Sequence, residues 1–76
     1  MKALTQKQAD VLAYIKEFIV EFKFSPTRSE IGDHFKIRPN AAQVRVEGLL
    51  KKGAVTHVRG KSRSTYPVEG FVVTIK

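Results

Sequence analysis

Hydrophobic residues recur at helical spacing through the first third of the chain. The positions that form this stripe are Val11, Leu12, Ile15, Phe18, Ile19 and Phe22. The spacing predicts one amphipathic helix over about residues 6–23. Thr5 and Gln8 have the spacing of a capping box, which satisfies two backbone N–H groups at a helix start, and Leu4 stands where a hydrophobic staple would pack.

A second capping box follows the first helix. Thr27 and Glu30 have the S/T-x-x-E spacing, and Ile31 and Phe35 share one helical face. These residues predict a short helix over 28–35.

The third helix follows after a tight connection, and its start has two interpretations. Pro39 suits a first helical position and makes Arg38 the N-cap, whereas Asn40 is itself a favourable N-cap with Gln43 three residues later. In both cases the helix is expected to end near Lys52, because the glycine that follows favours a helix C-terminus.

The polarity of this third helix differs around its circumference. Four apolar side chains fall on one side of a helical wheel and define the expected buried face: Ala42, Val46, Leu49 and Leu50. The opposite side carries Asn40, Val44, Glu47, Gly48 and Lys51, and it is flanked by Ala41, Gln43 and Arg45. The outward side therefore begins with small and amide-bearing residues, which allow close approach to another surface.

After Gly53 the pattern changes from helix to strand. Residues 54–58 are short and rich in β-branched side chains, residues 59–64 form a polar turn, and residues 65–68 can return as a second strand. Residues 71–75 are a third, mostly apolar strand candidate.

The order of these elements predicts an α+β, mainly helical fold. It is a three-helix winged helix-turn-helix with a C-terminal β-hairpin wing and a candidate extra strand. We expect residues 1–68 to form this domain and residues 69–76 to form a strand extension that serves dimerisation or supports the wing. In such a module the second helix of the pair enters the DNA major groove, and the hairpin reaches the backbone or the minor groove.

The charge of the chain favours a polyanionic partner. Its 76 residues include 14 Lys and Arg against 7 Asp and Glu, a net charge of +7 that lies mostly after residue 24. The absence of cysteine excludes disulfides and thiolate metal sites, and two distant histidines do not make a zinc site. No apolar run is long enough to span a bilayer and no signal stretch follows Met1, so we expect a cytoplasmic protein.

The third helix carries the candidate base contacts. Asn40 and Gln43 have amides that can pair bidentately with adenine, and Ala41 and Val44 offer methyl groups to thymine. Arg38 can fork onto guanine or hold a phosphate.

The candidate backbone contacts are basic residues near helix ends and in the polar turn. They are Arg28, Arg45, Lys51, Arg59, Lys61 and Arg63. In the turn the cations alternate with Gly and Ser and have no acid beside them in the sequence, which suits a phosphate track. The predicted partner is double-stranded DNA, with no cofactor, metal, membrane or small-molecule substrate. We do not expect an enzyme, because a chain this short, with its nearby serines in a polar turn, rarely builds a catalytic pocket.

Several short motifs stand in a characteristic order. They are Met1-Lys2-Ala3-Leu4-Thr5, Pro26-Thr27-Arg28-Ser29-Glu30-Ile31, Pro39-Asn40-Ala41-Ala42, Lys52-Gly53 and Ser62-Arg63. Over about residues 1–68 the chain thereby resembles the N-terminal DNA-binding domain of the LexA repressor family. The resemblance implies a winged helix-turn-helix that binds a palindromic operator as a homodimer and represses DNA-damage (SOS) genes. By position, it implies base contacts from Asn40, Ala41, Gln43 and Val44.

The chain also departs from that family pattern. The turn before Pro39 is one residue shorter, Arg38 stands where the family usually has serine, and Val44 and Arg45 occupy positions that are acidic or polar in the family. The base preference is therefore expected to differ. The family's second domain, with its Ser-Lys self-cleavage dyad, is not in this sequence. We expect either a piece of a longer protein or a naturally short relative, and the apolar ending at 71–75 favours the second.

A different class of function stays open. Winged helices also bind proteins, so the outward side of the third helix or the apolar strand could serve an adaptor or anti-repressor. Single-strand binders display aromatic residues on a basic sheet. Here the aromatic residues at helical spacing are expected in the core: Tyr14, Phe18, Phe22, Phe24 and Phe35. Glu30 is expected to be a capping residue and Glu47 a solvated carboxylate.

Overall fold

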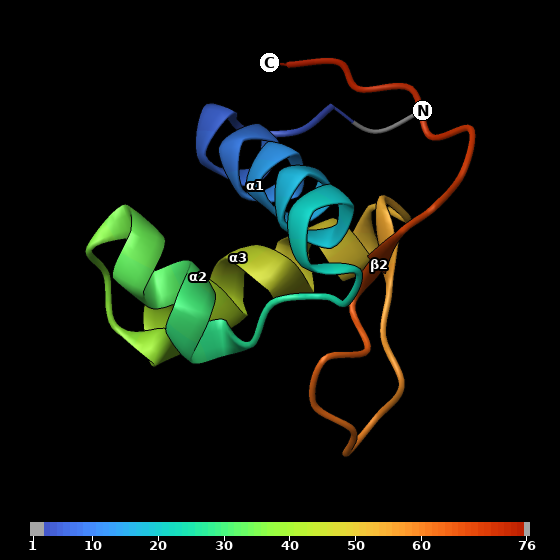
Figure 1. Ribbon diagram of the computed structural model, residues 1–76. Helices are drawn as coiled ribbons and strands as arrows, with labels where there is room; N and C mark the ends of the chain where they lie inside the picture. Colours follow the sequence, from blue (N-terminus) through green and yellow to red (C-terminus); the bar gives the residue numbers. More distant parts are fainter. Residues whose placement is uncertain (1–2, 76) are drawn as a thin grey trace.

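A computed structural model of the chain describes residues 3–75. The helices are α1 (Gln6–Phe22), α2 (Arg28–Phe35) and α3 (Pro39–Lys51), and they are followed by the antiparallel strands β1 (Val55–Thr56) and β2 (Tyr66–Pro67). The hairpin loop stands out from the helical body in Figure 1. The mainly helical winged helix-turn-helix is thereby confirmed. Met1, Lys2 and Lys76, which belong to the first family-like motif and to the predicted C-terminal strand, lie outside the described residues.

Both predicted capping boxes are confirmed. Thr5 Oγ1 accepts from the Gln8 N–H at 3.1 Å, and Gln8 Oε1 accepts from the Thr5 N–H at 3.0 Å. Thr27 and Glu30 make the same reciprocal pair at 3.1 and 2.8 Å. These bonds fix where α1 and α2 begin, because a helix start leaves backbone N–H groups without intrahelical partners.

The structure shows that α3 begins at Pro39. Arg38 is its N-cap, in an extended conformation and without a side-chain cap bond, and its carbonyl oxygen accepts from the N–H groups of Ala41 and Ala42. The alternative start with Asn40 as N-cap is wrong. The Arg38 side chain takes no part in capping and is exposed at the start of α3.

The tight connection between α2 and α3 depends on Gly32. The C-cap of α2 is Lys36, whose left-handed φ is 57°, and the Ile37 N–H donates to the Gly32 carbonyl at 2.9 Å. A Cβ at position 32 would lie 2.7 Å from the carbonyl oxygen of Ile37, so a larger residue would push the turn apart. This glycine therefore permits the close approach of the two helices.

The core lies where the three helices meet the first strand. Its largest buried apolar side chains are Leu4, Val11, Leu12, Ile15, Ile31, Val46 and Leu49. The predicted buried face of α3 is confirmed for Ala42, Val46 and Leu49, whereas Leu50 is only partly buried. None of the helices described within residues 3–75 is long and apolar enough to cross a membrane.

Two expectations about side-chain placement are wrong. Phe22 and Phe24 are 47% and 41% exposed, because they lie where α1 ends and pack on Phe18 at the margin of the core. Gly48 was expected on the outward side of α3, but a Cβ there would meet the Gln8 side chain. The helical wheel misplaces Gly48 because it takes no account of α1, which packs against α3.

The hairpin is shorter than predicted. Val55 pairs with Pro67 and Thr56 with Tyr66, so each strand has two residues. Beyond Pro67 the Val68 N–H still donates to the Ala54 carbonyl at 2.9 Å, and toward the tip the pairing ends at Thr56 and Tyr66. Residues 57–65 therefore form one long wing loop.

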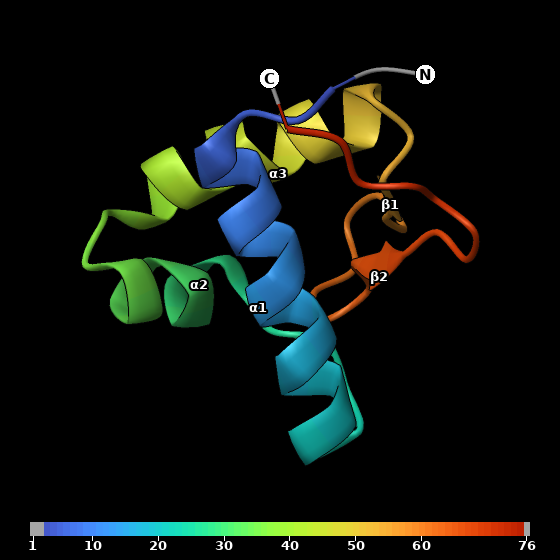
Figure 2. The same ribbon diagram turned by 90° about the horizontal axis from the view of Figure 1, so that it is seen from above.

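Residues 71–75 do not form the predicted third strand. Within the described residues they make one isolated parallel bridge, between Ile75 and Leu4, and the Leu4 N–H donates to the Thr74 carbonyl at 2.7 Å. Phe71 packs against the core. The segment thereby leaves the hairpin and returns to the chain start, where it is drawn in red beside the blue N-terminal residues (Figures 1 and 2).

Candidate nucleic-acid interface

The exposed side of α3 carries most of the predicted base contacts. Asn40 and Arg38 are exposed, Val44 is 68% exposed, and Ala41 is half-buried. This placement follows from the burial of the opposite side of the helix in the core. The structure therefore presents amide and methyl groups together along the first half of α3.

Gln43 is a predicted base contact that is already engaged within the protein. Its Oε1 accepts from Arg28 Nε at 2.6 Å, and its Nε2 donates to Glu47 Oε1 at 2.9 Å. These bonds fix the orientation of the amide. Each amide atom keeps a second hydrogen-bonding position, so Gln43 can still donate and accept once more. Glu47 is exposed, as expected, and it also orients Gln43.

Arg28, a predicted phosphate contact, links three parts of the fold. Besides Gln43, it donates from Nη1 to Thr65 Oγ1 at 3.0 Å. Burial lowers the pKa of the Arg28 guanidinium from its ordinary value, and the charge of Glu47 acts in the opposite direction. Arg28 therefore joins α2 to α3 and to the end of the wing loop. The sequence analysis missed Thr65 because no local pattern marks a threonine that lies 37 positions away from its partner.

The tip of the wing holds two exposed cations. Arg59 and Lys61 are exposed, and among residues 3–75 neither side chain has a hydrogen bond or an ion pair. Gly60, with a φ of 77°, turns the chain between them. Both predicted phosphate contacts are therefore accessible to a partner.

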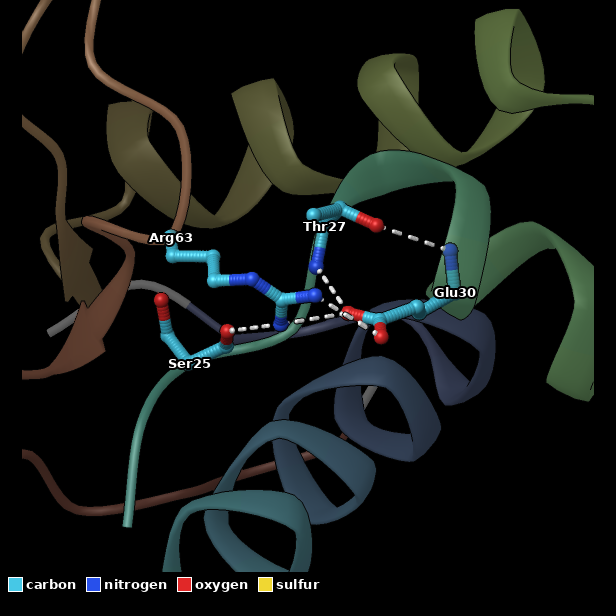
Figure 3. Close-up of polar contacts among 4 residues, drawn as sticks. All are labelled: Ser25, Thr27, Glu30 and Arg63. Carbon is cyan, nitrogen blue, oxygen red and sulfur yellow. Dashed lines mark hydrogen bonds and ion pairs between the residues drawn. The ribbon is translucent and has the colours of Figure 1, made fainter. Parts of the chain in front are cut away.

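No acid stands beside the wing cations in the sequence, but the fold brings one to Arg63. Its Nη1 and Nη2 donate to the two carboxylate oxygens of Glu30 at 2.8 and 3.1 Å, and Nη1 also donates to the Ser25 carbonyl at 3.2 Å (Figure 3). The guanidinium carbon lies 4.6 Å from the centre of the Phe24 ring. The hydrogen bond from Arg63 is the main cause that lowers the pKa of Glu30 below its ordinary value. Glu30 is 33 positions away in the sequence, so only the fold brings this acid to the wing.

His57 and Ser64 close the base of the wing loop. His57 Nδ1 lies 3.0 Å from both Ser64 Oγ and Thr65 Oγ1, and Ser64 Oγ accepts from the Val58 N–H at 3.1 Å. Burial, and then the charge of Arg28, lower the pKa of His57. In the part of the chain that the structure describes, no group of three or more His, Asp or Glu side chains could hold a metal ion.

A cleft of about 250 Å³ lies between the wing and the helices. Its lining residues come from α2 and its N-cap, from α3 and from the wing loop: Thr27, Arg28, Gln43, His57, Gly60, Lys61, Ser62 and Arg63. The cleft therefore connects a predicted base contact with the cations of the wing.

A known family corresponds to this architecture. The family model described as the LexA DNA binding domain matches residues 1–64. The chain belongs to the LexA DNA-binding domain family. The resemblance inferred from the sequence motifs is thereby confirmed.

LexA repressors from several organisms are similar to the chain. The protein of Thermosipho melanesiensis is 44% identical over 79 residues, which cover 100% of this chain and 40% of the relative. The protein of a Marinomonas species is 47% identical over 64 residues, and that of Pseudomonas aeruginosa 39% over 64 residues; each alignment covers 83% of this chain and 31% of the relative. The chain thus spans less than half the length of these LexA repressors.

Every candidate contact lies inside the stretch that matches the LexA DNA-binding domain. The match contains all three helices, β1 and most of the wing loop, and Arg63 is the last predicted contact within it. Strand β2 and residues 71–75 follow the matched stretch.

Proposed function

We propose that this chain is the sequence-specific, double-stranded DNA-binding module of a LexA-like transcriptional repressor. In this proposal α3 enters the major groove and the wing tip holds the sugar-phosphate backbone. One observation carries it: Gln43 of α3 and Lys61 of the wing tip line the same cleft. Membership of the LexA DNA-binding domain family and the LexA repressor relatives support the same function.

Base recognition is assigned to the first half of α3. Asn40 pairs with an adenine edge, Ala41 and Val44 contact thymine methyl groups, and Arg38 binds guanine or a phosphate. Gln43 contributes an amide with one donor and one acceptor position left, because Arg28 occupies one side of its oxygen and Glu47 one hydrogen of its nitrogen. That remaining pair suits the major-groove edge of adenine.

Backbone binding is assigned to the basic residues of the wing tip, of α3 and of the start of α2. Arg59 and Lys61 hold phosphates from the wing tip, and Arg45 and Lys51 do so from α3. Arg28 lines the cleft and reaches a phosphate there with Nη2, since the described bonds to Gln43 and Thr65 use Nε and Nη1.

The proposal also includes the oligomeric state and the setting. The chain binds a palindromic operator as a homodimer, in the cytoplasm and as part of an SOS response. Val72, Val73 and Ile75 are 56%, 40% and 53% exposed, which supports pairing of this segment with a second copy across a two-fold axis. Sedimentation of the chain with and without residues 70–76 tests this role. An equal mass for the two forms would remove the segment from the dimer.

The test of DNA recognition is selection of binding sites from a randomised duplex pool, followed by affinity measurements across salt concentrations. Asn40→Ala is expected to reduce the preference for the selected site by about 1–3 kcal/mol and to leave non-specific affinity unchanged. Lys16→Ala, on an exposed position of α1, is the control for a substitution away from the interface. A pool without enrichment would reject sequence-specific binding, and equal weakening on all sequences would show that Asn40 does not read bases.

One observation favours a protein-binding adaptor or anti-repressor as a second candidate. Large apolar side chains that do not line the cleft are exposed at and just after the end of α1 and in residues 71–75: Val20, Phe22, Phe24, Val72, Val73 and Ile75. In a pull-down, an adaptor would keep its bound protein after nuclease treatment. A DNA-binding module would lose any protein that was held only through DNA.

A further inference from the structure

Arg63 holds an unfavourable backbone conformation and points away from the wing tip. Its φ of 53° lies in the left-handed region, which a residue other than glycine adopts at a cost. The side chain reaches back to Glu30 and to the Ser25 carbonyl (Figure 3). A strained backbone of this kind persists where the surrounding contacts over-determine it.

We propose that the Arg63–Glu30 ion pair is a brace that holds the wing against the start of α2, so that Arg63 is a positioning residue for DNA binding and not a phosphate contact. The inference rests on the proposed function, because it concerns what the wing does on DNA.

The helix end of this brace is rigid. Glu30 lies at the third position of α2, and its carboxylate also accepts the Thr27 N–H at 2.8 Å within the capping box. The acceptor that Arg63 binds is therefore fixed by the backbone of the helix-turn-helix.

The wing end of the brace uses the properties of arginine. A guanidinium presents a planar fork that matches a carboxylate bidentately and can lie over an aromatic face. Arg63 does both, with its fork on Glu30 and its carbon 4.6 Å from the centre of the Phe24 ring. Nη1 uses both of its hydrogens on Glu30 and Ser25, and Nη2 uses one of its two on Glu30, so three of the four terminal N–H donors are engaged within the protein.

The brace sets the position of Lys61. Lys61 and Arg63 are two residues apart in the loop and line the same cleft. The pair adds no net charge to the cleft, since Glu30 and Arg63 neutralise each other. Its contribution is to order the loop before DNA arrives, so that Lys61 reaches a phosphate without the entropy cost of fixing the chain at that moment.

The first arm of the test needs no DNA. The double variant Glu30→Gln/Arg63→Gln removes one charge of each sign, so the net charge is unchanged, and Gln at position 30 can still form a capping box. We expect the amide of Lys61, which donates to the Val58 carbonyl, to exchange its hydrogen about tenfold faster, because the loop loses its anchor. Unchanged exchange in the core of α1 reports that the fold is intact, and unchanged exchange at Lys61 would overturn the brace.

The second arm measures how much Lys61 contributes to DNA binding with and without the brace. In the wild-type background, Lys61→Gln is expected to reduce the slope of log affinity against log salt by about 0.9. In the Glu30→Gln/Arg63→Gln background, the same change is expected to reduce the slope by less than about half of that value. Lys51→Gln, on α3, is the matched control and is expected to have the same effect in both backgrounds.

The possible results separate the two proposals. Equal slope changes for Lys61→Gln in both backgrounds would overturn the brace and leave the proposed function standing. A wild-type protein without salt-dependent duplex binding would overturn the proposed function and the role of the brace on DNA together. A reduced Lys61 effect with an unchanged Lys51 effect supports the brace, because a loss of overall stability would not act on the wing alone.

Discussion

The tip and the base of the wing loop carry similar residues in different surroundings. At the tip, Arg59 and Lys61 are exposed, and the described residues offer neither side chain a partner. At the base, Arg63 is paired with Glu30, and Ser64 and Thr65 are buried. Within the same wing loop, therefore, some cations are available to a phosphate and another is neutralised by the protein itself. The number of cations counted in a sequence is therefore an upper limit on the number that a partner can bind.

This difference suggests separate tasks for the two halves of the loop. The base is tied to the helices through Arg28, which binds both Thr65 and Gln43, and through the Arg63–Glu30 pair. Substitutions at the base should therefore affect stability first, while substitutions at the tip should affect DNA binding first.

The largest effect is expected for Arg28, the α2 residue that ties the base of the wing loop to the helices. Arg28→Ala removes the donor from Gln43 Oε1 and from the fully buried Thr65. Thr65 Oγ1 keeps His57 Nδ1 as a partner, so the loss is that of two hydrogen bonds worth about 0.5–1.5 kcal/mol each. We therefore expect the free energy of unfolding in urea to fall by about 1–3 kcal/mol. Arg59→Ala at the tip is the control and is expected to change it by less than about 0.5 kcal/mol. Equal losses for the two variants would contradict the division between base and tip.

A smaller loss of stability is expected for Arg63→Ala. Arg63 is expected to matter more than Lys61 for stability, and Lys61 more than Arg63 for DNA binding. Arg63 and Glu30 side chains are 38% and 34% exposed, so screening limits the loss for Arg63→Ala to about 1 kcal/mol of unfolding free energy. Lys61→Ala is expected to cost less than about 0.5 kcal/mol of stability. On duplex DNA of any sequence, Lys61→Ala should reduce the salt slope by about 0.9, because it removes one phosphate contact. A stability loss at Lys61 as large as that at Arg63 would argue that the tip is also structural.

Local sequence patterns predicted most of the fold. Both capping boxes, the range of α2 and the buried face of α3 follow from contacts within a few residues, and these were confirmed except at Leu50, which is only partly buried. The errors concern long-range packing. Residues 71–75 have strand composition, but Phe71 and Thr74 bind the segment to the core and to the chain start, where only an isolated bridge forms.

In the candidate interface, the sequence predicted which α3 side chains are exposed, but it did not predict which side chains are bonded to distant residues. Exposure of Asn40 and Val44 follows from helical geometry. The partners of Arg28 and Arg63 lie 15 to 38 positions away, so no periodicity or spacing rule connects them. Charge patterning treats such residues as free cations because it contains no information about which acids and carbonyls the fold brings near.

The smallest effect is expected from the protonation of His57 at the base of the wing. Burial and Arg28 lower its pKa below the ordinary 6.5, so the folded protein binds this proton less readily than the unfolded chain does. The His57 contribution to stability is therefore complete above about pH 6.5 and declines as the pH falls from there through the lowered value, because unfolding then takes up a proton. The lowered pKa of Glu30 affects stability only at lower pH, below its ordinary value of 4.5.

Urea unfolding at about pH 7.5 and about pH 5.5 therefore reports on the histidine and not on Glu30, and His57→Gln is expected to reduce the fall in unfolding free energy between these two pH values. The same measurement on His34→Gln shows what the other histidine contributes, and a His57→Gln variant that keeps the full decline would remove His57 from the network that holds the base of the wing.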